Sequence, residues 1–501
     1  MKSICFYFQI HQPFRLKTYR FFDIGNDHYY YDDFANDDII TRIAQRSYMP
    51  ANQMLLDMIK ENGKKFKVAF SISGTALEQL EQYVPEFIDS MKELADTGCV
   101  EFLSETYAHS LASLVDPEEF VAQVKAHDEK IYQLFGQRPK VFRNTELIYD
   151  DDIASMVASM GFKGAITDGA KHILGWKSPN YLYKAASAPK LRLLLKNSKL
   201  SDDIAFRFSN PEWSAYPLNA DKYIEWIAAL PEEEILVNLF MNYETFGELQ
   251  PRESGIFEFM KALPRFASQY NIEFMTPSEV VSKIKPVGEL SVMHPISWAD
   301  EARDTSAWMG NILQDEAVNK LYCLGERIRM VTDKRIRQDW NYLQASDHFY
   351  YMSTKHSSDG SVHSHYSPYD SPYAAFTNYM NVLSDFLIRV REQFPEEIEN
   401  EELNALLLTI RNQEKEIDEL NREVELLRKN IVMDTTGDFV PRVEATEAEP
   451  EKPKAKKAPV KTTAEKKTPA KKAPAKKEAV KKAPAKKTVE KKSPAKKTTK
   501  K

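Results

Sequence analysis

Long apolar runs are absent from this 501-residue sequence, which has no stretch of 18 or more apolar residues. A conventional membrane-spanning helix is therefore excluded. The apolar start, "MKSICFYFQIHQPF", breaks into His11-Gln12-Pro13 too early for a signal-peptide core with a small-residue cleavage site. We expect a cytoplasmic protein without a membrane span.

Cysteine is also scarce, with Cys5, Cys99 and Cys323 far apart and in no CxxC or Cys/His cluster. An odd number of scattered cysteines argues against a disulfide framework and against a zinc site. The sequence also has no glycine-rich phosphate loop and no HExxH helix, which disfavours phosphoryl transfer and zinc hydrolysis. We therefore expect no cofactor and no metal.

Charge is distributed very unevenly along the chain. Residues 451–501 hold 21 lysines and 4 glutamates, a charge of +17, so with −6 for the whole chain the remainder carries −23. Repeats such as "AKKAPAKKEAVKKAPAKK" lack aromatic residues and cannot bury enough apolar surface to fold, so residues 440–501 are predicted to be a disordered Lys/Ala/Pro-rich tail. Its similarity to linker-histone tails indicates weak, salt-sensitive contact with nucleic acid or another anionic surface, and a solubilising role is the alternative.

A seven-residue repeat precedes this tail. Within 398–432 the apolar positions are Leu403, Ile410, Ile417, Val424 and Ile431, with Leu406, Leu420 and Leu427 three residues after three of them. β-Branched residues mostly at a and leucine at d are typical of parallel coiled-coil dimers, and Gln413 interrupts the d series. We predict a homodimer formed through 398–432; the alternative is an amphipathic helix packed on the body of the protein.

The first 390 residues have the pattern of an α/β fold. Apolar segments typical of buried parallel strands lie at 3–10, 66–73, 99–106, 140–147, 162–167, 191–197 and 234–241. Helix-like segments at 50–63 and 85–98 each end in a glycine suited to a C-cap. Seven strands alternating with helices predict a (β/α)7 TIM-like catalytic barrel over 1–289, followed by a helical region over 290–390 that completes the catalytic body.

Polar residues follow four of the predicted strands. These are His11-Gln12-Pro13, then Glu101 to Glu105 with Tyr107 and His109, then Arg143 to Glu146, and finally Asn242, Tyr243 and Glu244. Taken singly, such residues are commonly turn or surface groups. Because the carboxyl ends of barrel strands form one face, their recurrence at four ends predicts a shared active site.

Carboxylates facing one another among aromatic residues are most simply used in glycoside hydrolysis. One carboxylate attacks the sugar or activates water, and another protonates the leaving oxygen. Trp176, Trp298, Trp308 and the Tyr29-Tyr30-Tyr31 run could provide apolar platforms for sugar rings, although core packing is the commoner role of each aromatic.

The motifs resemble those of glycoside hydrolase family 57 over residues 1–385, most closely its bacterial α-amylase branch. They are "HQPFRLKTYRFFDIG", "VAFSISGTALEQL", "GCVEFLSETYAHSL", "VFRNTELIYDDDIA", "FMNYETFGE" and "SWADEARDTSAWMGN". The resemblance implies an incomplete (β/α)7 barrel with a helical region, acting on α-glucans or maltooligosaccharides. It also implies roles for His11 as the active-site histidine, Glu101 as the second-motif glutamate and Glu146 as the catalytic nucleophile.

At position 242 the sequence departs from the family pattern, because Asn242 stands where the resemblance implies an aspartate acid/base. An amide cannot donate a proton as a carboxylic acid does, and general acid–base help is worth roughly 10²–10⁴ in rate. Glu244 lies two residues on and is expected to face the same cavity. We expect His109, Glu244 and Trp308, with His11 and Glu101, to bind substrate.

Three readings of function follow. The leading one is an α-glucan-acting retaining hydrolase or 4-α-glucanotransferase that uses Glu146 and is impaired or rerouted by Asn242. The second is a non-catalytic glucan-binding pseudoenzyme or scaffold, dimerised by the coiled coil and anchored by its basic tail. The third makes the tail primary and associates the protein with the nucleoid.

Overall fold

The computed structural model describes residues 1–355 and 366–394, and only short pieces beyond them. These pieces are the helical residues Gln413, Ile417 and Leu420 and two paired strands, β11 (Ile431–Met433) and β12 (Phe439–Pro441). The predicted coiled coil, 398–432, and basic tail, 440–501, otherwise lie outside the described residues and stay predictions. Met1–Gln413 form one compact unit and Glu414–Lys501 a second, and the description below concerns the first.

Seven parallel strands close into a barrel. They are β1 (Lys2–Ile10), β2 (Val68–Ile72), β3 (Val100–Phe102), β4 (Val141–Arg143), β5 (Gly164–Asp168), β7 (Arg192–Lys196) and β8 (Leu236–Asn242). β1 pairs with both β2 and β8, β4 with β5, and β5 with β7. The ring closes through the Ser104–Phe142 bridge and the Lys196–Asn238 pair. Each of the seven predicted strands is confirmed.

Three short strands were not predicted, and two predicted strands end early. β6 (Tyr183–Ala185) runs antiparallel to β7, β10 (Gly288–Leu290) pairs in parallel with β6, and β9 (Ile272–Phe274) pairs with the start of β1. Three residues are too few to show a period in sequence. The predicted strands 99–106 and 140–147 stop at Phe102 and Arg143 because the chain turns there.

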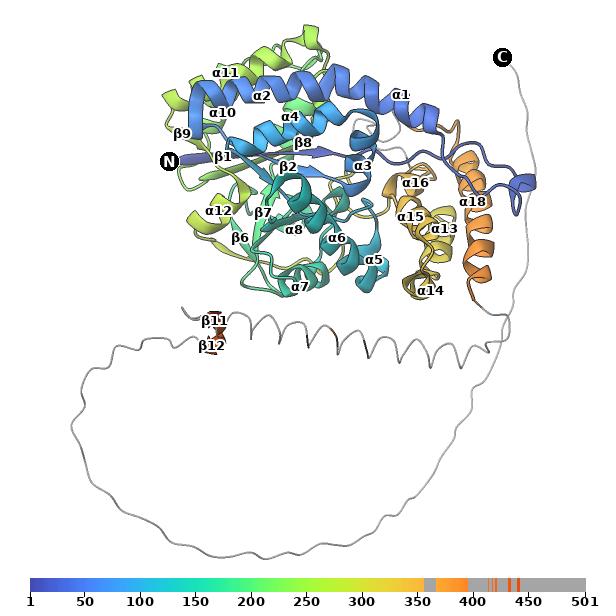
Figure 1. Ribbon diagram of the computed structural model, residues 1–501. Helices are drawn as coiled ribbons and strands as arrows, with labels where there is room; N and C mark the ends of the chain where they lie inside the picture. The colour runs from blue at the N-terminus through green and yellow to red at the C-terminus, as the bar shows by residue number, and fades with distance from the viewer. Residues whose placement is uncertain are drawn as a thin grey trace, which may run out of the picture. The chain divides into compact units, whose positions relative to one another are not determined.

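Helices surround the barrel (Figure 1). They are α1 (Asp33–Ile43), α2 (Met49–Asn62), α3 (Gly74–Tyr83), α4 (Pro85–Asp96), α5 (Ala112–Val115), α6 (Pro117–Phe135), α7 (Asp151–Ser159), α8 (Lys171–Leu174), α9 (Ser198–Ala205), α10 (Ala220–Ala228), α11 (Ile256–Gln269) and α12 (Pro277–Lys283). The predicted helices at 50–63 and 85–98 are confirmed as α2 and α4. Gly63 and Gly98, which follow them, have positive φ angles of 55° and 67°.

Side chains of the barrel strands alternate between two cores. On β1, Cys5 and Tyr7 pack inside the barrel, whereas Phe6 and Phe8 pack outward in the core that the surrounding helices share. Gln9 and His11 continue the inward series at the carboxyl end of the strand. The sheet geometry therefore points polar side chains of β1 into the open end of the barrel.

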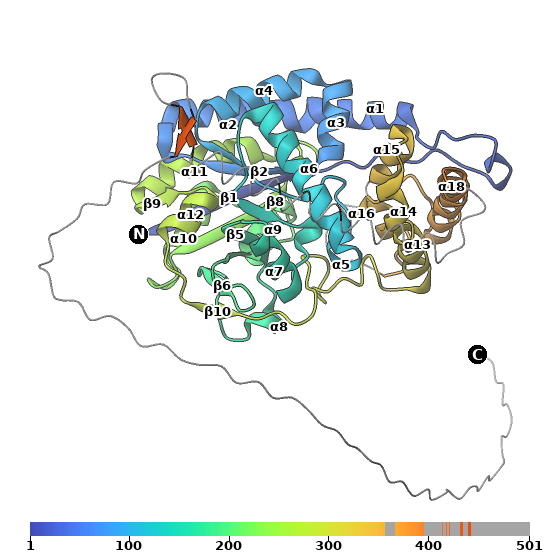
Figure 2. The same ribbon diagram turned by 60° about the horizontal axis from the view of Figure 1, so that its bottom comes forward.

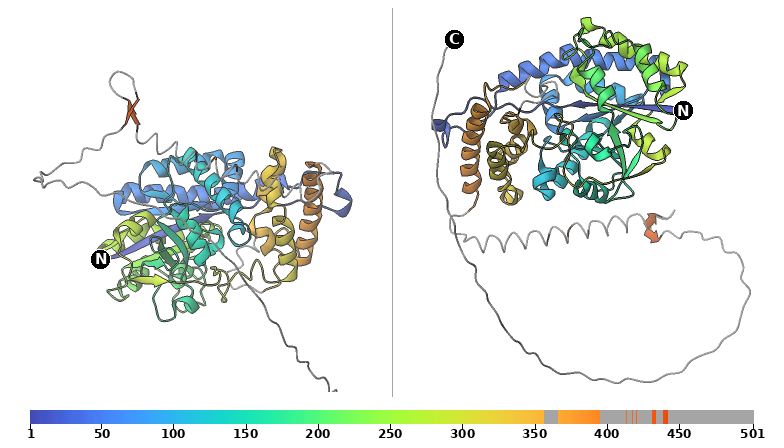
Figure 3. Two further views of the ribbon diagram at one scale, coloured as in Figure 1. Left: turned by 90° about the horizontal axis from the view of Figure 1, so that it is seen from below. Right: turned by 180° about the vertical axis from the view of Figure 1, so that it is seen from behind.

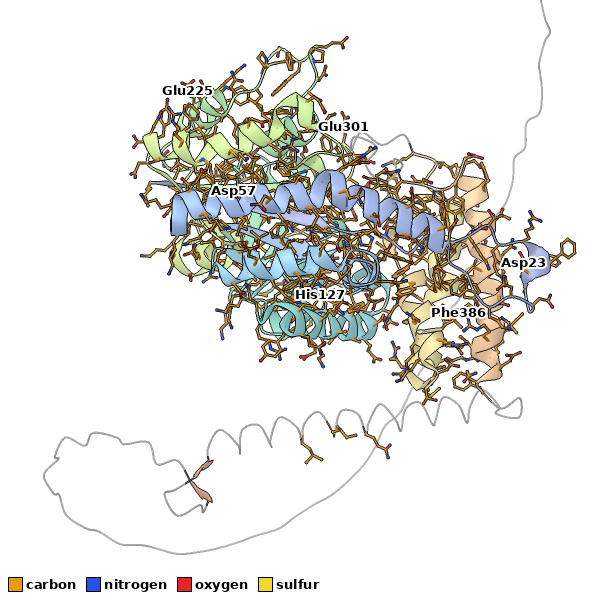
Figure 4. All side chains as sticks on the ribbon, turned by 45° about the horizontal axis from the view of Figure 1, so that its top comes forward. Asp23, Asp57, His127, Glu225, Glu301 and Phe386 are labelled. Atoms are coloured by element: carbon orange, nitrogen blue, oxygen red, sulfur yellow. The ribbon has the colours of Figure 1, made fainter. Side chains whose placement is uncertain are left out.

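A C-terminal group of helices lies beside this end of the barrel, drawn in yellow and orange in Figure 1 and again to one side in Figure 2 and Figure 3. Its members are α13 (Ile312–Tyr322), α14 (Gly325–Met330), α15 (Lys334–Leu343), α16 (Ser346–Tyr350) and α18 (Pro372–Glu392). The predicted helical region, 290–390, thus begins later than expected, since 291–311 contains no helix. Phe386, labelled in Figure 4, is buried on α18. Among the described residues, no helix is both long enough and apolar enough to cross a bilayer.

Candidate active site

Polar side chains at the carboxyl ends of β1, β4 and β8 line one pocket. Its walls are Gln9, His11, Gln12, Pro13, Arg15, Glu146, Asn242, Glu244, Trp298, Asp347 and Tyr366. The barrel and the C-terminal helical region both contribute. Four of the residues predicted for the site, His11, Glu146, Asn242 and Glu244, meet here.

Glu146 is presented by a strained turn after β4. In the short 3-10 turn Thr145–Leu147, Glu146 has φ 53° and ψ 26°, and Leu147 follows with φ 55°. Left-handed backbone costs about 1–3 kcal/mol for such residues and is concentrated at functional sites. Glu146 Oε1 lies 2.8 Å from His109 Nε2, and Oε2 accepts a 2.6 Å bond from Trp298 Nε1. Both oxygens of the carboxylate are therefore held in place.

His109 joins two carboxylates in the barrel interior. Its Nδ1 lies 2.9 Å from Glu105 Oε2, opposite the contact to Glu146, and all three side chains are at most 1% exposed. Burial opposes ionisation of Glu105, but His109 and Arg143 outweigh it and lower the pKa of Glu105 to about 2. Burial likewise opposes charge on His109, yet Glu105 and Glu146 raise its pKa. The interior thus favours an imidazolium between two carboxylates.

Glu105 is fixed by several further donors. Ser71 Oγ donates a 2.8 Å bond to its Oε1, and Arg143 Nη1 lies 3.7 Å from its Oε2. Its backbone N–H donates to Nδ1 of His127, whose Nε2 lies 2.8 Å from the carbonyl of Ile72. His127, labelled on α6 in Figure 4, therefore ties a surrounding helix to the site.

His11 connects the barrel to the helical region. Its Nδ1 lies 2.7 Å from Ser73 Oγ, and its Nε2 lies 2.8 Å from Asp347 Oδ2 on α16. The ring stacks on His109 with 4.0 Å between centroids. Burial and then the neighbouring His109 lower the pKa of His11. A neutral His11 above a charged His109 avoids placing two imidazolium rings face to face.

Asn242 and Glu244 come from the end of β8. Asn242 is partly exposed to the pocket, and its buried Oδ1 accepts no hydrogen bond from the described residues. Glu244 sits in the 3-10 turn Tyr243–Thr245, where its Oε1 accepts bonds from Tyr48 OH at 2.5 Å and Gln12 Nε2 at 3.2 Å. Burial raises the pKa of Glu244 to about 7.

Two residues expected to bind substrate lie elsewhere. Glu101 faces the barrel interior nearer the amino end of the strands, where the Ser278 backbone N–H and hydroxyl donate to it at 2.9 and 2.6 Å. Trp308 is 0% exposed and packs in the helical core near Tyr350. Neither is part of the pocket lining. His109, also expected to bind substrate, is fully buried outside the lining and contacts the pocket residues Glu146 and His11. The tryptophan at the pocket is Trp298, which the sequence could only place among several candidate platforms.

The sequence did not assign a role to Asp347 or to Gln12 and Arg15. Asp347 lies in "ASDHFY", where a charged residue inside a mostly buried helix is the available signal. Arg15 is 2% exposed, and its Nη2 donates a 2.7 Å bond to Gln12 Oε1. Both residues extend the "HQPFR" motif beyond His11, so the motif could have indicated them.

Comparison with known proteins gives the family of the chain. The family model for glycosyl hydrolase family 57 matches residues 5–293, more than half of the chain. A proposed alpha-amylase of Methanocaldococcus jannaschii is 42% identical over 403 residues, covering 78% of this chain and 85% of that protein. Alpha-amylase 1 of Dictyoglomus thermophilum is 24% identical over 263 residues, which cover 51% of this chain but only 36% of that protein.

The fold is also found among solved structures. The family 57 branching enzyme from Thermococcus kodakaraensis, solved in complex with glucose, matches with a TM-score of 0.57 and 12% sequence identity, over 81% of this chain and 94% of its own. A match at that identity bears on the fold alone. From the family match and the 42% identical relative, we conclude that the chain belongs to glycosyl hydrolase family 57.

Proposed function

We propose that the protein is an α-amylase-like enzyme that cleaves α-glucans or maltooligosaccharides with retention of configuration, using Glu146 as nucleophile. The observation that carries the proposal is the placement of Glu146, which lines the pocket with both carboxylate oxygens fixed by His109 and Trp298. The alpha-amylase names of the related proteins supply the substrate class.

The charges around Glu146 suit a nucleophile. A carboxylate attacks only in its ionised form, and the imidazolium of His109 beside Glu146 stabilises that form. Arg143 adds a second buried positive charge nearby. Glu146 would attack the anomeric carbon and form a glycosyl-enzyme ester, which water or a second sugar then opens. If a second sugar opens the ester, the protein is a 4-α-glucanotransferase.

Departure of the sugar leaving group needs a proton, which Asn242 cannot supply. Activated substrates, whose leaving groups are weak bases, bypass this need. Formation of the ester on Glu146 can therefore be tested separately from proton transfer.

The test is to incubate the protein with a 5-fluoro α-maltosyl fluoride and to search its peptides by mass spectrometry. We expect a glycosyl adduct on the peptide containing Glu146, absent in Glu146→Gln and retained in the matched variant Glu101→Gln, whose carboxyl lies outside the pocket. No adduct on the wild-type protein, together with glucan binding by calorimetry and no turnover of maltooligosaccharides, would instead support a glucan-binding protein.

A further inference from the structure

We propose that Glu244 is the general acid and base of this site, supplying the proton that Asn242 cannot. The inference rests on the proposed function, because it assigns the second half of the reaction that Glu146 begins. It is carried by the position of the Glu244 carboxyl in the pocket and by its neutral contact partners, whereas Glu146 contacts the charged His109.

Glu244 reaches the pocket from the same strand as Asn242. On β8 the side chains of Leu236 and Phe240 pack inside the barrel, so Asn242 continues the inward series. Glu244 is two residues further on, in a turn that keeps its carboxyl in the pocket lining. The hydrogen bonds from Tyr48 and Gln12 both end on Oε1, and Oε2 takes part in neither. Glu244 is therefore a carboxyl held at one oxygen within the cavity that holds Glu146.

The two carboxyls differ in their charged neighbours. Glu146 contacts His109, which its own partners keep protonated, whereas Glu244 contacts a phenol and an amide, and no ion pair to it occurs among the described residues. A buried carboxyl with neutral partners keeps its proton, and burial raises the pKa of Glu244 to about 7. A protonated acid and an ionised nucleophile in one pocket require carboxyl surroundings that differ in this way.

The other titratable groups near Glu244 do not ionise it. Glu248 raises the Glu244 pKa further, and its own oxygens lie 3.9 Å from Arg42 and Arg46. Burial, and then the neighbouring Glu244, raises the pKa of the Tyr366 phenol. Arg15 directs one guanidinium nitrogen to Gln12 and another to the Tyr366 carbonyl.

Each proton is accounted for in two steps. In the first, Glu146 bonds to the anomeric carbon, the glycosidic C–O bond breaks, and the Glu244 proton passes to the departing oxygen, which leaves as a hydroxyl. In the second, the Glu244 carboxylate takes a proton from water while that water's oxygen attacks the anomeric carbon. This frees Glu146 and restores protonated Glu244. A sugar hydroxyl in place of water gives transfer.

The test compares Glu244→Gln with wild type on two substrates. We expect kcat for maltooligosaccharides to fall by about 10²–10⁴, and adduct formation from α-maltosyl fluoride to fall less than about tenfold, because fluoride leaves with little protonation. Sodium azide, which needs no base, should raise turnover of the fluoride by Glu244→Gln and give an α-glycosyl azide. Glu253→Gln, a change at an exposed carboxyl outside the pocket lining, is the matched control and should change either rate by less than about threefold.

Two further variants separate acid catalysis from a structural role. Tyr48→Phe removes a bond that favours ionised Glu244, so the pKa rises and the alkaline limb of the kcat profile should move to higher pH. Asn242→Asp should raise kcat less than about tenfold when it is the only change. In the Glu244→Gln background the same change should raise kcat more than about tenfold.

Several results would overturn the inference. One is an equal loss of rate on both substrates in Glu244→Gln, with no azide product. Another is an alkaline limb of the kcat profile that does not move in Tyr48→Phe. A third is a rise in kcat above about 10²-fold from Asn242→Asp alone, which would show that the acid had been missing. Failure of the proposed function looks different, because the wild-type protein itself would then form no adduct with the fluoride.

Discussion

Replacing His109 by glutamine tests the buried charge network most directly. The change removes the imidazolium that lies 2.9 Å from Glu105 and 2.8 Å from Glu146 and leaves two carboxylates with Arg143 as their nearest positive charge. Removing one partner of a buried ion pair typically costs about 3–5 kcal/mol. The variant should therefore be both less stable and less active.

The pKa of Glu105 gives a second value for the stability that the buried charges contribute. A fall from the ordinary value of 4.5 to about 2 corresponds to roughly 3 kcal/mol of stabilisation, shared by His109 and Arg143. The Glu105 contribution is complete above pH 4.5 and is lost as the pH falls toward 2. The His109 contribution is complete below pH 6.5 and is lost as the pH rises through the folded-state value. The stability difference between wild type and variant should be largest between these limits.

Urea denaturation of wild type and His109→Gln at pH 5.5 and at pH 3 checks this expectation. The difference in unfolding free energy should be about 3 kcal/mol at pH 5.5 and clearly smaller at pH 3. His28→Gln is a matched control, since His28 pairs with Asp385 but its side chain is 50% exposed, and should cost less than about 1 kcal/mol. A loss below about 1 kcal/mol for His109→Gln, or one that does not change with pH, would refute a charged His109.

Three other changes test separate parts of the structure. Trp298→Phe keeps an aromatic ring but removes the hydrogen bond to Glu146. A hydrogen bond to a charged group is worth about 1.5–3 kcal/mol, so kcat/KM should fall about 10–150-fold, with little change in the unfolding midpoint. Trp308→Ala should destabilise the fold by about 3–5 kcal/mol while leaving KM unchanged, because this ring is core; a raised KM at full stability would return it to the substrate site. Deleting 395–501 should leave kcat/KM unchanged and, by light scattering, convert a dimer to a monomer, and an unchanged mass would contradict the predicted coiled coil.

The barrel was predictable because each of its seven predicted segments spans six to eight residues and contains a cluster of apolar side chains, so even β3 and β4, which are three residues long, lie within a longer apolar pattern. The strands of three residues at 183–185, 272–274 and 288–290 leave no such pattern and are specified by their neighbours. The helices at 49–62 and 85–96 were predictable from apolar spacing and a following glycine.

The site was predictable where a side chain lies at or just beyond the end of a strand, as with His11, Glu146 and Asn242. Asp347 was not predictable, and Trp298 could be named only as one of several candidate platforms, since helices and loops place these residues through contacts distant in sequence. The structure places Glu101 outside the pocket lining. The segment that follows the start of β3 carries polar residues at two levels of the barrel, and only the fold shows that Glu105 lies near Glu146.

The bond between His11 and Asp347 spans 336 residues and joins the first strand to the last part of the body. During synthesis the ribosome must make most of the chain before this wall of the pocket can form. Contacts so distant in sequence form slowly and are expected among the last in folding. A partly made or partly unfolded chain can thus possess the barrel strands without a complete active site, so catalytic activity would report the integrity of the whole body and not that of the barrel alone.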